Sequence, residues 1–108
     1  MGLDQYAFAR RGEEQLNIAY WRKHANLEGW MAELYEKRGG KDIFNCVELR
    51  LFEDDIAALE EQYQNLTDVK GFFWGDSRPE DDEKTKEFIE GAKCFIEDGW
   101  EIIYTSWW

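Results

Sequence analysis

Arg22, Lys23 and His24 are three cationic or potentially cationic side chains in a row, just before the clearest helical stripe of the sequence. The guanidinium of Arg22 can hold a phosphate or carboxylate through two parallel hydrogen bonds, and Lys23 adds a point charge. A helix start carries free N–H groups and partial positive charge, so acids are favoured there. Cations at this position break that rule. We therefore interpret this end of the helix as a site that faces something anionic.

Planar side chains accompany these cations. Stacking of an aromatic ring on a nucleic-acid base is worth about 1–3 kcal/mol per base. The aromatics that could stack on a planar ligand are Trp21, Phe73, Trp74, Trp107 and Trp108. Asn26 lies one helical turn beyond Arg22 and could bind an amide or base edge. The predicted ligand-binding residues are Trp21, Arg22, Lys23, Asn26, Phe73 and Trp74.

Alternatives to this site remain open. Arg22 and Lys23 could be paired internally with acids such as Asp4, which could equally be solvated. Each aromatic could simply fill the core, because a small domain must fill its interior with large side chains.

The sequence does not indicate catalysis or metal binding. A nucleophilic triad requires a histidine, and His24 is the only one. The acidic pairs at 54–55 and 81–82 lack the spacing of a calcium loop and are typical of solvated helix starts. Cys46 and Cys94 are predicted to be buried free thiols, with a disulfide or a reactive cysteine as the alternative. We expect a binding protein without cofactor or metal, not an enzyme.

The charge is unevenly distributed. The 108 residues carry a net charge of −11, with net +1 over residues 1–41 and net −12 over residues 42–108. A strongly acidic chain is a poor general binder of nucleic acid, so one cationic site suits a small anion better than a polymer. The acidic half supports a second hypothesis, a nucleic-acid mimic that binds a basic protein. The oligomeric state stays open, a homo-oligomer included.

The composition predicts one folded domain over residues 1–108, since 44% of the residues are hydrophobic and 17% aromatic. No apolar run approaches the roughly 20 residues that span a bilayer. The N-terminus shows no charged-then-apolar signal pattern, so we expect a cytoplasmic protein.

Hydrophobic periodicity predicts the elements that must position the site. The helical stripe before 38 consists of Leu27, Trp30, Met31, Leu34 and Tyr35. Strands are predicted over 2–10, 43–52 and 101–108, and helices over 21–38, 54–65 and from a capping signal at 76–80 to 97. Residues 13–19 fit either a short strand or the first turns of the helix. Residues 71–75 fit a short strand or a shaped loop. The predicted class is α+β, with about four strands in one mixed or antiparallel sheet against about three helices on one face; a partly parallel sheet is the alternative.

Four short motifs resemble a family of small, largely uncharacterised bacteriophage proteins, cyanophage proteins among them. The motifs are Met-Gly-Leu-Asp-Gln-Tyr at 1–6, Tyr-Trp-Arg-Lys-x-x-Asn at 20–26, Gly-Phe-Phe-Trp-Gly at 71–75 and Tyr-x-Ser-Trp-Trp at 104–108. The resemblance implies an accessory protein made in the cytoplasm of an infected bacterium, for host takeover or against host defence. It implies no established activity.

Overall fold

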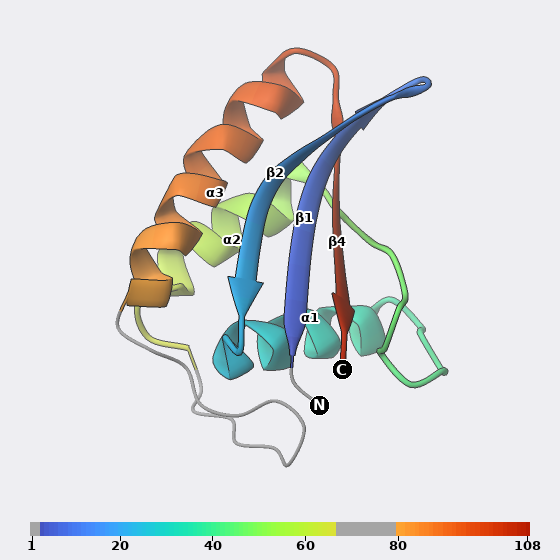
Figure 1. Cartoon of the computed structure of the whole chain (residues 1–108), viewed down its shortest axis with the longest axis vertical. Coiled ribbons are helices and arrows are strands. Elements are labelled where there is room, and N and C mark those ends of the chain that lie inside the picture. Colours follow the sequence, from blue (N-terminus) through green and yellow to red (C-terminus); the bar gives the residue numbers. More distant parts are fainter. Residues whose placement is uncertain (1–2, 67–79) are drawn as a thin grey trace.

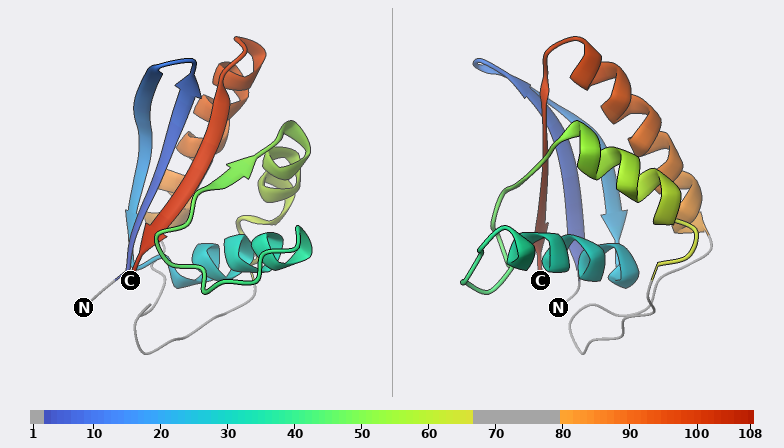
Figure 2. Two further views of the ribbon diagram at one scale, coloured as in Figure 1. Left: turned by 90° about the vertical axis from the view of Figure 1, so that its right-hand side faces the viewer. Right: turned by 180° about the vertical axis from the view of Figure 1, so that it is seen from behind.

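In the computed structural model, which describes residues 3–66 and 80–108, four strands form one antiparallel sheet and three helices cover one of its faces (Figures 1 and 2). The strands are β1 (Asp4–Arg11), β2 (Glu14–Arg22), β3 (Leu49–Leu51) and β4 (Glu101–Trp107). The helices are α1 (Ala25–Lys37), α2 (Glu53–Gln62) and α3 (Glu80–Glu97). The strand order is β2-β1-β4-β3, and every neighbouring pair is antiparallel. The predicted α+β class with helices on one face is therefore confirmed, and the partly parallel alternative is wrong.

The sheet begins with a tight hairpin. β1 and β2 are joined by two residues, and Gly12 takes the first position with φ 60°. Glycine suits a two-residue hairpin turn because it adopts a positive φ at no steric cost. β2 bulges where its pairing with β1 shifts register between Ala7 and Phe8.

The two faces of the sheet differ in residue size. Ala7 and Ala9 of β1 face the helices, where they belong to the core cluster together with Trp21 of β2 and Tyr104 of β4. Side chains alternate along a strand, so Tyr6 and Phe8 face the other way. The register places the following side chains on what we call the helix-free face: Asp4, Tyr6, Phe8, Arg10, Gln15, Asn17, Tyr20, Arg22, Arg50, Glu101, Ile103, Thr105 and Trp107.

The core lies between the sheet and the helices. The stripe of α1 contributes Leu27 and Met31, and α3 contributes Phe88 and Ile89, all of them almost fully buried. Small alanines on β1 leave room there for the large rings of the neighbouring strands. Trp21 is fully buried and packs edge-on against Phe88, with 5.2 Å between ring centroids. None of the described helices has the length and apolar character needed to cross a membrane.

Several predicted boundaries are wrong. The first helix starts at Ala25 and not near residue 21, because β2 continues through Arg22 and extends over most of the ambiguous residues 13–19. The strand expected over 43–52 shrinks to Leu49–Leu51. Helix 54–65 begins one residue earlier and ends at Gln62, and 80–97 is confirmed as helix. The expected element at 71–75 lies outside the described residues.

The prediction for the cysteines is half right. Cys46 and Cys94 are free thiols, as expected, but both are exposed rather than buried. Cys46 lies in the irregular segment before β3 instead of in a strand, and Cys94 lies on a solvent-facing flank of α3.

Candidate functional site

The predicted site residues Trp21 and Arg22 separate onto opposite faces of the sheet. Because residues 20–22 form a strand rather than a helix, consecutive side chains alternate. The indole of Trp21 points into the core, where its Nε1–H donates to Thr85 Oγ1 at 3.0 Å. Trp21 therefore cannot stack on a ligand, and its place in the predicted site is a wrong prediction. Arg22 is exposed on the helix-free face.

Arg22 differs from the other described arginines in its electrostatic surroundings. On the same face, Arg10 pairs with Glu48 at 3.0 Å, and Arg50 pairs with Glu101 at 2.9 Å. Elsewhere, Arg11 pairs with Asp98 and Arg38 with Asp55. Among residues 3–66 and 80–108, Arg22 is the one arginine without an ion pair. Its guanidinium is thus available to an external anion.

Aromatic rings surround the end of the sheet at which Arg22 lies. The ring of Tyr20 lies 5.2 Å from that of Tyr6 on the neighbouring strand, at an interplanar angle of 47°. Trp107, on the next strand across, is 66% exposed, and Tyr20 is 45% exposed. Exposed rings of this size on a sheet face are the feature that sheet-based nucleic-acid-binding domains use to stack on bases.

Asp4 lies in the middle of this arrangement. It is the cross-strand partner of Arg22 on one side and of Trp107 on the other. Its Oδ1 accepts a hydrogen bond of 2.7 Å from the Tyr20 hydroxyl, and this bond raises the pKa of Tyr20. The structure shows no ion pair between Asp4 and Arg22, so the internal pairing considered from the sequence does not form. We call Asp4, Tyr6, Tyr20, Arg22 and Trp107 together the Arg22 site.

The other predicted site residues are only loosely associated with it. Lys23 follows Arg22 in a left-handed turn with φ 66°, is partly exposed and forms no ion pair with a described residue. Asn26 is partly exposed in the first turn of α1. Phe73 and Trp74 lie outside the described residues. Of the four predicted residues that the structure describes, Arg22 is the one that lies together with exposed aromatics.

A buried amide fixes the turn that ends β2. Gln5 is fully buried; its Nε2 donates to the His24 carbonyl at 3.0 Å, and its Oε1 accepts the His24 N–H at 2.8 Å. The Lys23 N–H donates to the Leu3 carbonyl at 2.8 Å. Three hydrogen bonds thus hold this turn to Gln5 of β1 and to Leu3 just before it, which keeps Arg22 at a defined place on the helix-free face.

His24 is not part of a cationic surface. Its side chain is almost fully buried at the N-cap of α1, and its Nδ1 lies 4.0 Å from Asp81 Oδ2. Burial lowers the pKa of His24, although the nearby Asp81 and Asp82 act in the opposite direction. The cationic end predicted from three adjacent residues is therefore carried by Arg22 and Lys23.

A second buried polar group, the carboxyl group of Glu28, lies between α1 and β4. The carboxyl group of Glu28 is fully buried and accepts the Tyr104 hydroxyl at 2.6 Å and the Ser106 hydroxyl at 2.8 Å. Burial raises the pKa of Glu28 to about 7, and the hydrogen bonds from Tyr104 and Ser106 limit the rise. Tyr104 also accepts a 2.9 Å hydrogen bond from Gln5, so one network connects α1, β1 and β4.

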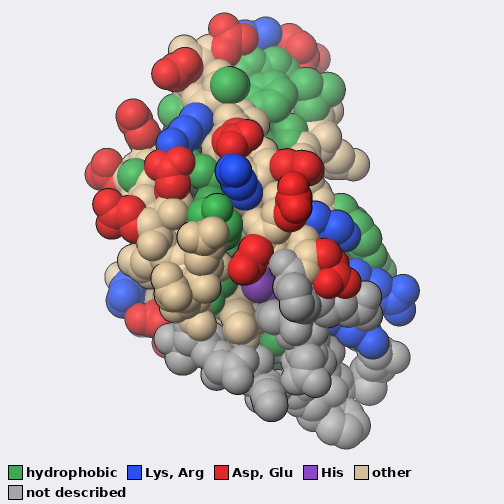
Figure 3. All heavy atoms as spheres, turned by 90° about the vertical axis from the view of Figure 1, so that its left-hand side faces the viewer, with side chains coloured by type: hydrophobic (Ala, Val, Ile, Leu, Met, Phe, Trp, Pro, Cys, Tyr) green, Lys and Arg blue, Asp and Glu red, His purple; other side chains and the backbone are tan. Residues whose placement is uncertain are grey.

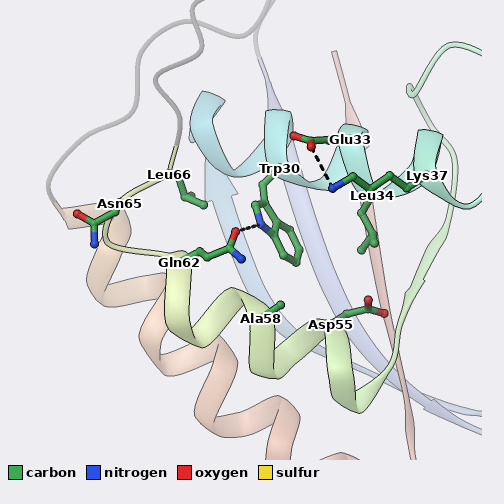
Figure 4. A pocket seen from close by; sticks show the side chains of 9 residues that line it. All are labelled: Trp30, Glu33, Leu34, Lys37, Asp55, Ala58, Gln62, Asn65 and Leu66. Carbon is green, nitrogen blue, oxygen red and sulfur yellow. Dashed lines mark hydrogen bonds and ion pairs between the residues drawn. The ribbon is translucent and has the colours of Figure 1, made fainter.

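The structure also has a cleft of about 350 Å³ between α1 and α2 (Figure 4). Its lining residues are Trp30, Glu33, Leu34, Lys37, Asp55, Ala58, Gln62, Asn65 and Leu66. Its polar groups largely bind one another: Trp30 Nε1 donates to Gln62 Oε1 at 2.9 Å, and Lys37 pairs with Glu33 at 3.1 Å. Trp21, Arg22, Lys23 and Asn26, the predicted site residues within the described part of the chain, do not line this cleft. It is therefore a weaker candidate for an anion than the Arg22 site.

Sequence reasoning missed Tyr6 and Tyr20 as site residues. Both were visible as large aromatics in stretches of alternating side chains, and a strand assignment through residue 22 would have placed Tyr20 and Arg22 on one face. Gln5 and Glu28 had no comparable signal, because their partners lie 19 to 99 residues away along the chain.

Among the described residues, no group of three His, Cys, Asp or Glu side chains is placed to hold a metal ion. Comparison with protein-family models, with curated proteins and with solved structures found no match to this chain.

Proposed function

We propose that this protein binds a small anionic, nucleotide-like ligand at the Arg22 site without altering it. The observation that carries the proposal is the exposed Arg22, which has no ion pair among the described residues and lies at the same end of the helix-free face as the tilted Tyr6–Tyr20 pair. An arginine holds phosphate through paired charge-assisted hydrogen bonds, and aromatic rings stack on any base. The two chemistries that a nucleotide needs are thus adjacent.

The number of available charges limits the size of the ligand. Arg10 and Arg50, the other arginines of the helix-free face, are each paired with a glutamate. A polymer would require several cations to neutralise successive phosphates, whereas one guanidinium suits one phosphate group. We therefore propose a nucleotide-sized molecule in preference to nucleic acid.

The Arg22 site also offers little for catalysis. Its residues include neither a histidine nor a cysteine, and its single carboxylate already accepts a hydrogen bond from Tyr20. Combined with the resemblance to small phage proteins, this favours sequestration: the protein would hold a nucleotide signal of an infected bacterium away from its receptor.

Replacing Arg22 by alanine is expected to weaken binding of nucleoside monophosphates at least tenfold, because hydrogen bonds to a charged group contribute about 1.5–3 kcal/mol. Isothermal titration of the whole chain with a nucleotide panel measures this. The matched control is Arg50→Ala, which removes an arginine of the same face that is paired with Glu101, and it should leave affinity within about twofold. Equal losses in both variants, or no binding to the wild type, would contradict the proposal. Ligand recovered after denaturation should be chemically unchanged.

A second function is favoured by the acidic helices. α2 has five acids and no lysine or arginine, and α3 has seven acids and three lysines. Viewed from the α3 side, acidic side chains are distributed over the surface with few cations between them (Figure 3). Such a surface could attract a basic protein, as a nucleic-acid mimic does.

Salt dependence tests this second function. A partner held by the acidic helices should be captured from a bacterial lysate at low salt and lost at high salt, because exposed charges are screened beyond about 10 Å at 0.1 M. Replacing Glu80, Glu83 and Glu87, exposed acids of α3, by glutamine should weaken the capture at low salt. A partner that stays bound in high salt, or binds the glutamine variant equally well, would show that the charges of α3 are not the cause.

A further inference from the structure

We infer that Asp4 selects, among planar ligands of the Arg22 site, those that present N–H donors on one edge, as guanine does. This inference rests on the proposed function and specifies its ligand class. The observation behind it is the place of Asp4 on the helix-free face. Asp4 lies between Arg22 and Trp107 across the strands and two residues before Tyr6 along β1, so it borders the surface on which a base would stack.

A carboxylate in an anion site needs a compensating interaction. Asp4 repels a phosphate, and it is an acceptor for hydrogen bonds with no donor to offer in its ionised form. Its Oδ1 accepts the Tyr20 hydroxyl at 2.7 Å, whereas its Oδ2 accepts no hydrogen bond from any residue in the described parts of the chain. The second oxygen is therefore open to a donor from outside.

The geometry of β1 gives that donor a direction. Residues two apart on a strand lie on the same face about 6.5–7 Å apart, so a ring stacked on Tyr6 brings its edge toward Asp4. The hydrogen bond from Tyr20 holds the carboxylate in place on the same surface. Phosphate then extends toward Arg22, which lies on the neighbouring strand.

Nucleobases differ in what they offer to a carboxylate. Guanine carries two neighbouring donors, N1–H and the 2-amino group, on one edge. Hypoxanthine keeps N1–H and lacks the amino group, and adenine has an amino group next to an acceptor nitrogen. A carboxylate therefore gains most from guanine, less from hypoxanthine and least from adenine.

Titration of the full chain with GMP, IMP and AMP tests the inference. We expect GMP to bind about tenfold more tightly than IMP, as one hydrogen bond to a charged group predicts, and more tightly than AMP. In Asp4→Asn the GMP-to-IMP ratio should fall to near 1, while Asp54→Asn, an exposed acid on α2, should keep the wild-type ratio. The ratio of the GMP and IMP affinities is measured on the wild type itself, so the inference can be tested even if Asp4→Asn does not fold.

The outcomes distinguish failure of the proposed role of Asp4 from failure of the proposed nucleotide binding at the Arg22 site. If the three nucleotides bind the wild type equally and Arg22→Ala weakens all of them, the role of Asp4 is refuted and the proposed function stands. A preference for AMP would also refute it. If none of the three binds, both the proposed function and the inference fail.

Discussion

Replacing Trp21 by alanine is expected to lower the free energy of unfolding by about 3–5 kcal/mol, the range for removing a large aromatic side chain from a core. Trp21 is fully buried, packs edge-on against Phe88, and donates a hydrogen bond to Thr85 on α3. The substitution removes a ring contact and a hydrogen bond between the edge strand β2 and α3, and it leaves Thr85 without that donor. Urea unfolding followed by tyrosine and tryptophan fluorescence measures the change.

The matched control is Trp107→Ala, because Trp107 is 66% exposed on the helix-free face. A tryptophan that keeps most of its surface in water contributes little to folding, so this variant should stay within about 1 kcal/mol of the wild type. Similar losses in the two variants would show that Trp21 is not the tryptophan on which the core depends.

Glu28 is expected to make the protein less stable as the pH rises from about 4.5 to about 7. Its pKa rises from 4.5 to about 7 in the folded protein, so the folded state binds more protons than the unfolded state between these values. The stabilisation is fully present below the unfolded pKa and is lost as the pH passes the folded pKa. A shift of this size corresponds to roughly 3 kcal/mol. Chemical unfolding at a series of pH values measures the loss.

Glu28→Gln isolates this contribution, because an amide does not titrate. The pH profile of the variant should lack the fall between pH 4.5 and 7, whatever its absolute stability. The comparison is needed because His24 acts in the opposite direction: its pKa is lowered by burial, so its contribution to stability falls as the pH drops below the ordinary histidine value of about 6.5. Parallel profiles for wild type and variant would mean that Glu28 does not ionise in this range.

The fold was predictable from the sequence where the periodicity was strong. The stripe of α1, the helix α3 and the β-branched strand β4 were all recognised, and the α+β class followed from their order. The junction between β2 and α1 was not, because residues 20–24 fit either element. The observed form of this junction depends on the left-handed turn at Lys23 and on two hydrogen bonds between His24 and Gln5, which lie 19 positions apart.

The position of the junction between β2 and α1 also determined which predicted site residues lie together. With a helix assumed from residue 21, Trp21 and Arg22 were expected to act together. In a strand they point in opposite directions, so Trp21 became a core residue and Tyr20 took its place beside Arg22. Arg22 remains a predicted anion-binding residue, but a boundary error of four residues at the start of α1 replaced Trp21 with Tyr20 as the aromatic beside it.

The strand order has a consequence for how the chain folds. The two central strands, β1 and β4, come from opposite ends of the sequence, and Asp4 pairs with Trp107. Nearly the whole chain must be looped out before these strands can meet, and closing so long a loop is entropically costly. Pairing between strands so far apart in sequence is expected to make folding slower than that of a helical protein of the same size. While residues 101–107 are still inside the ribosome, the emerging chain can form the β1–β2 hairpin, but the middle of the sheet stays open until β4 has left the ribosome.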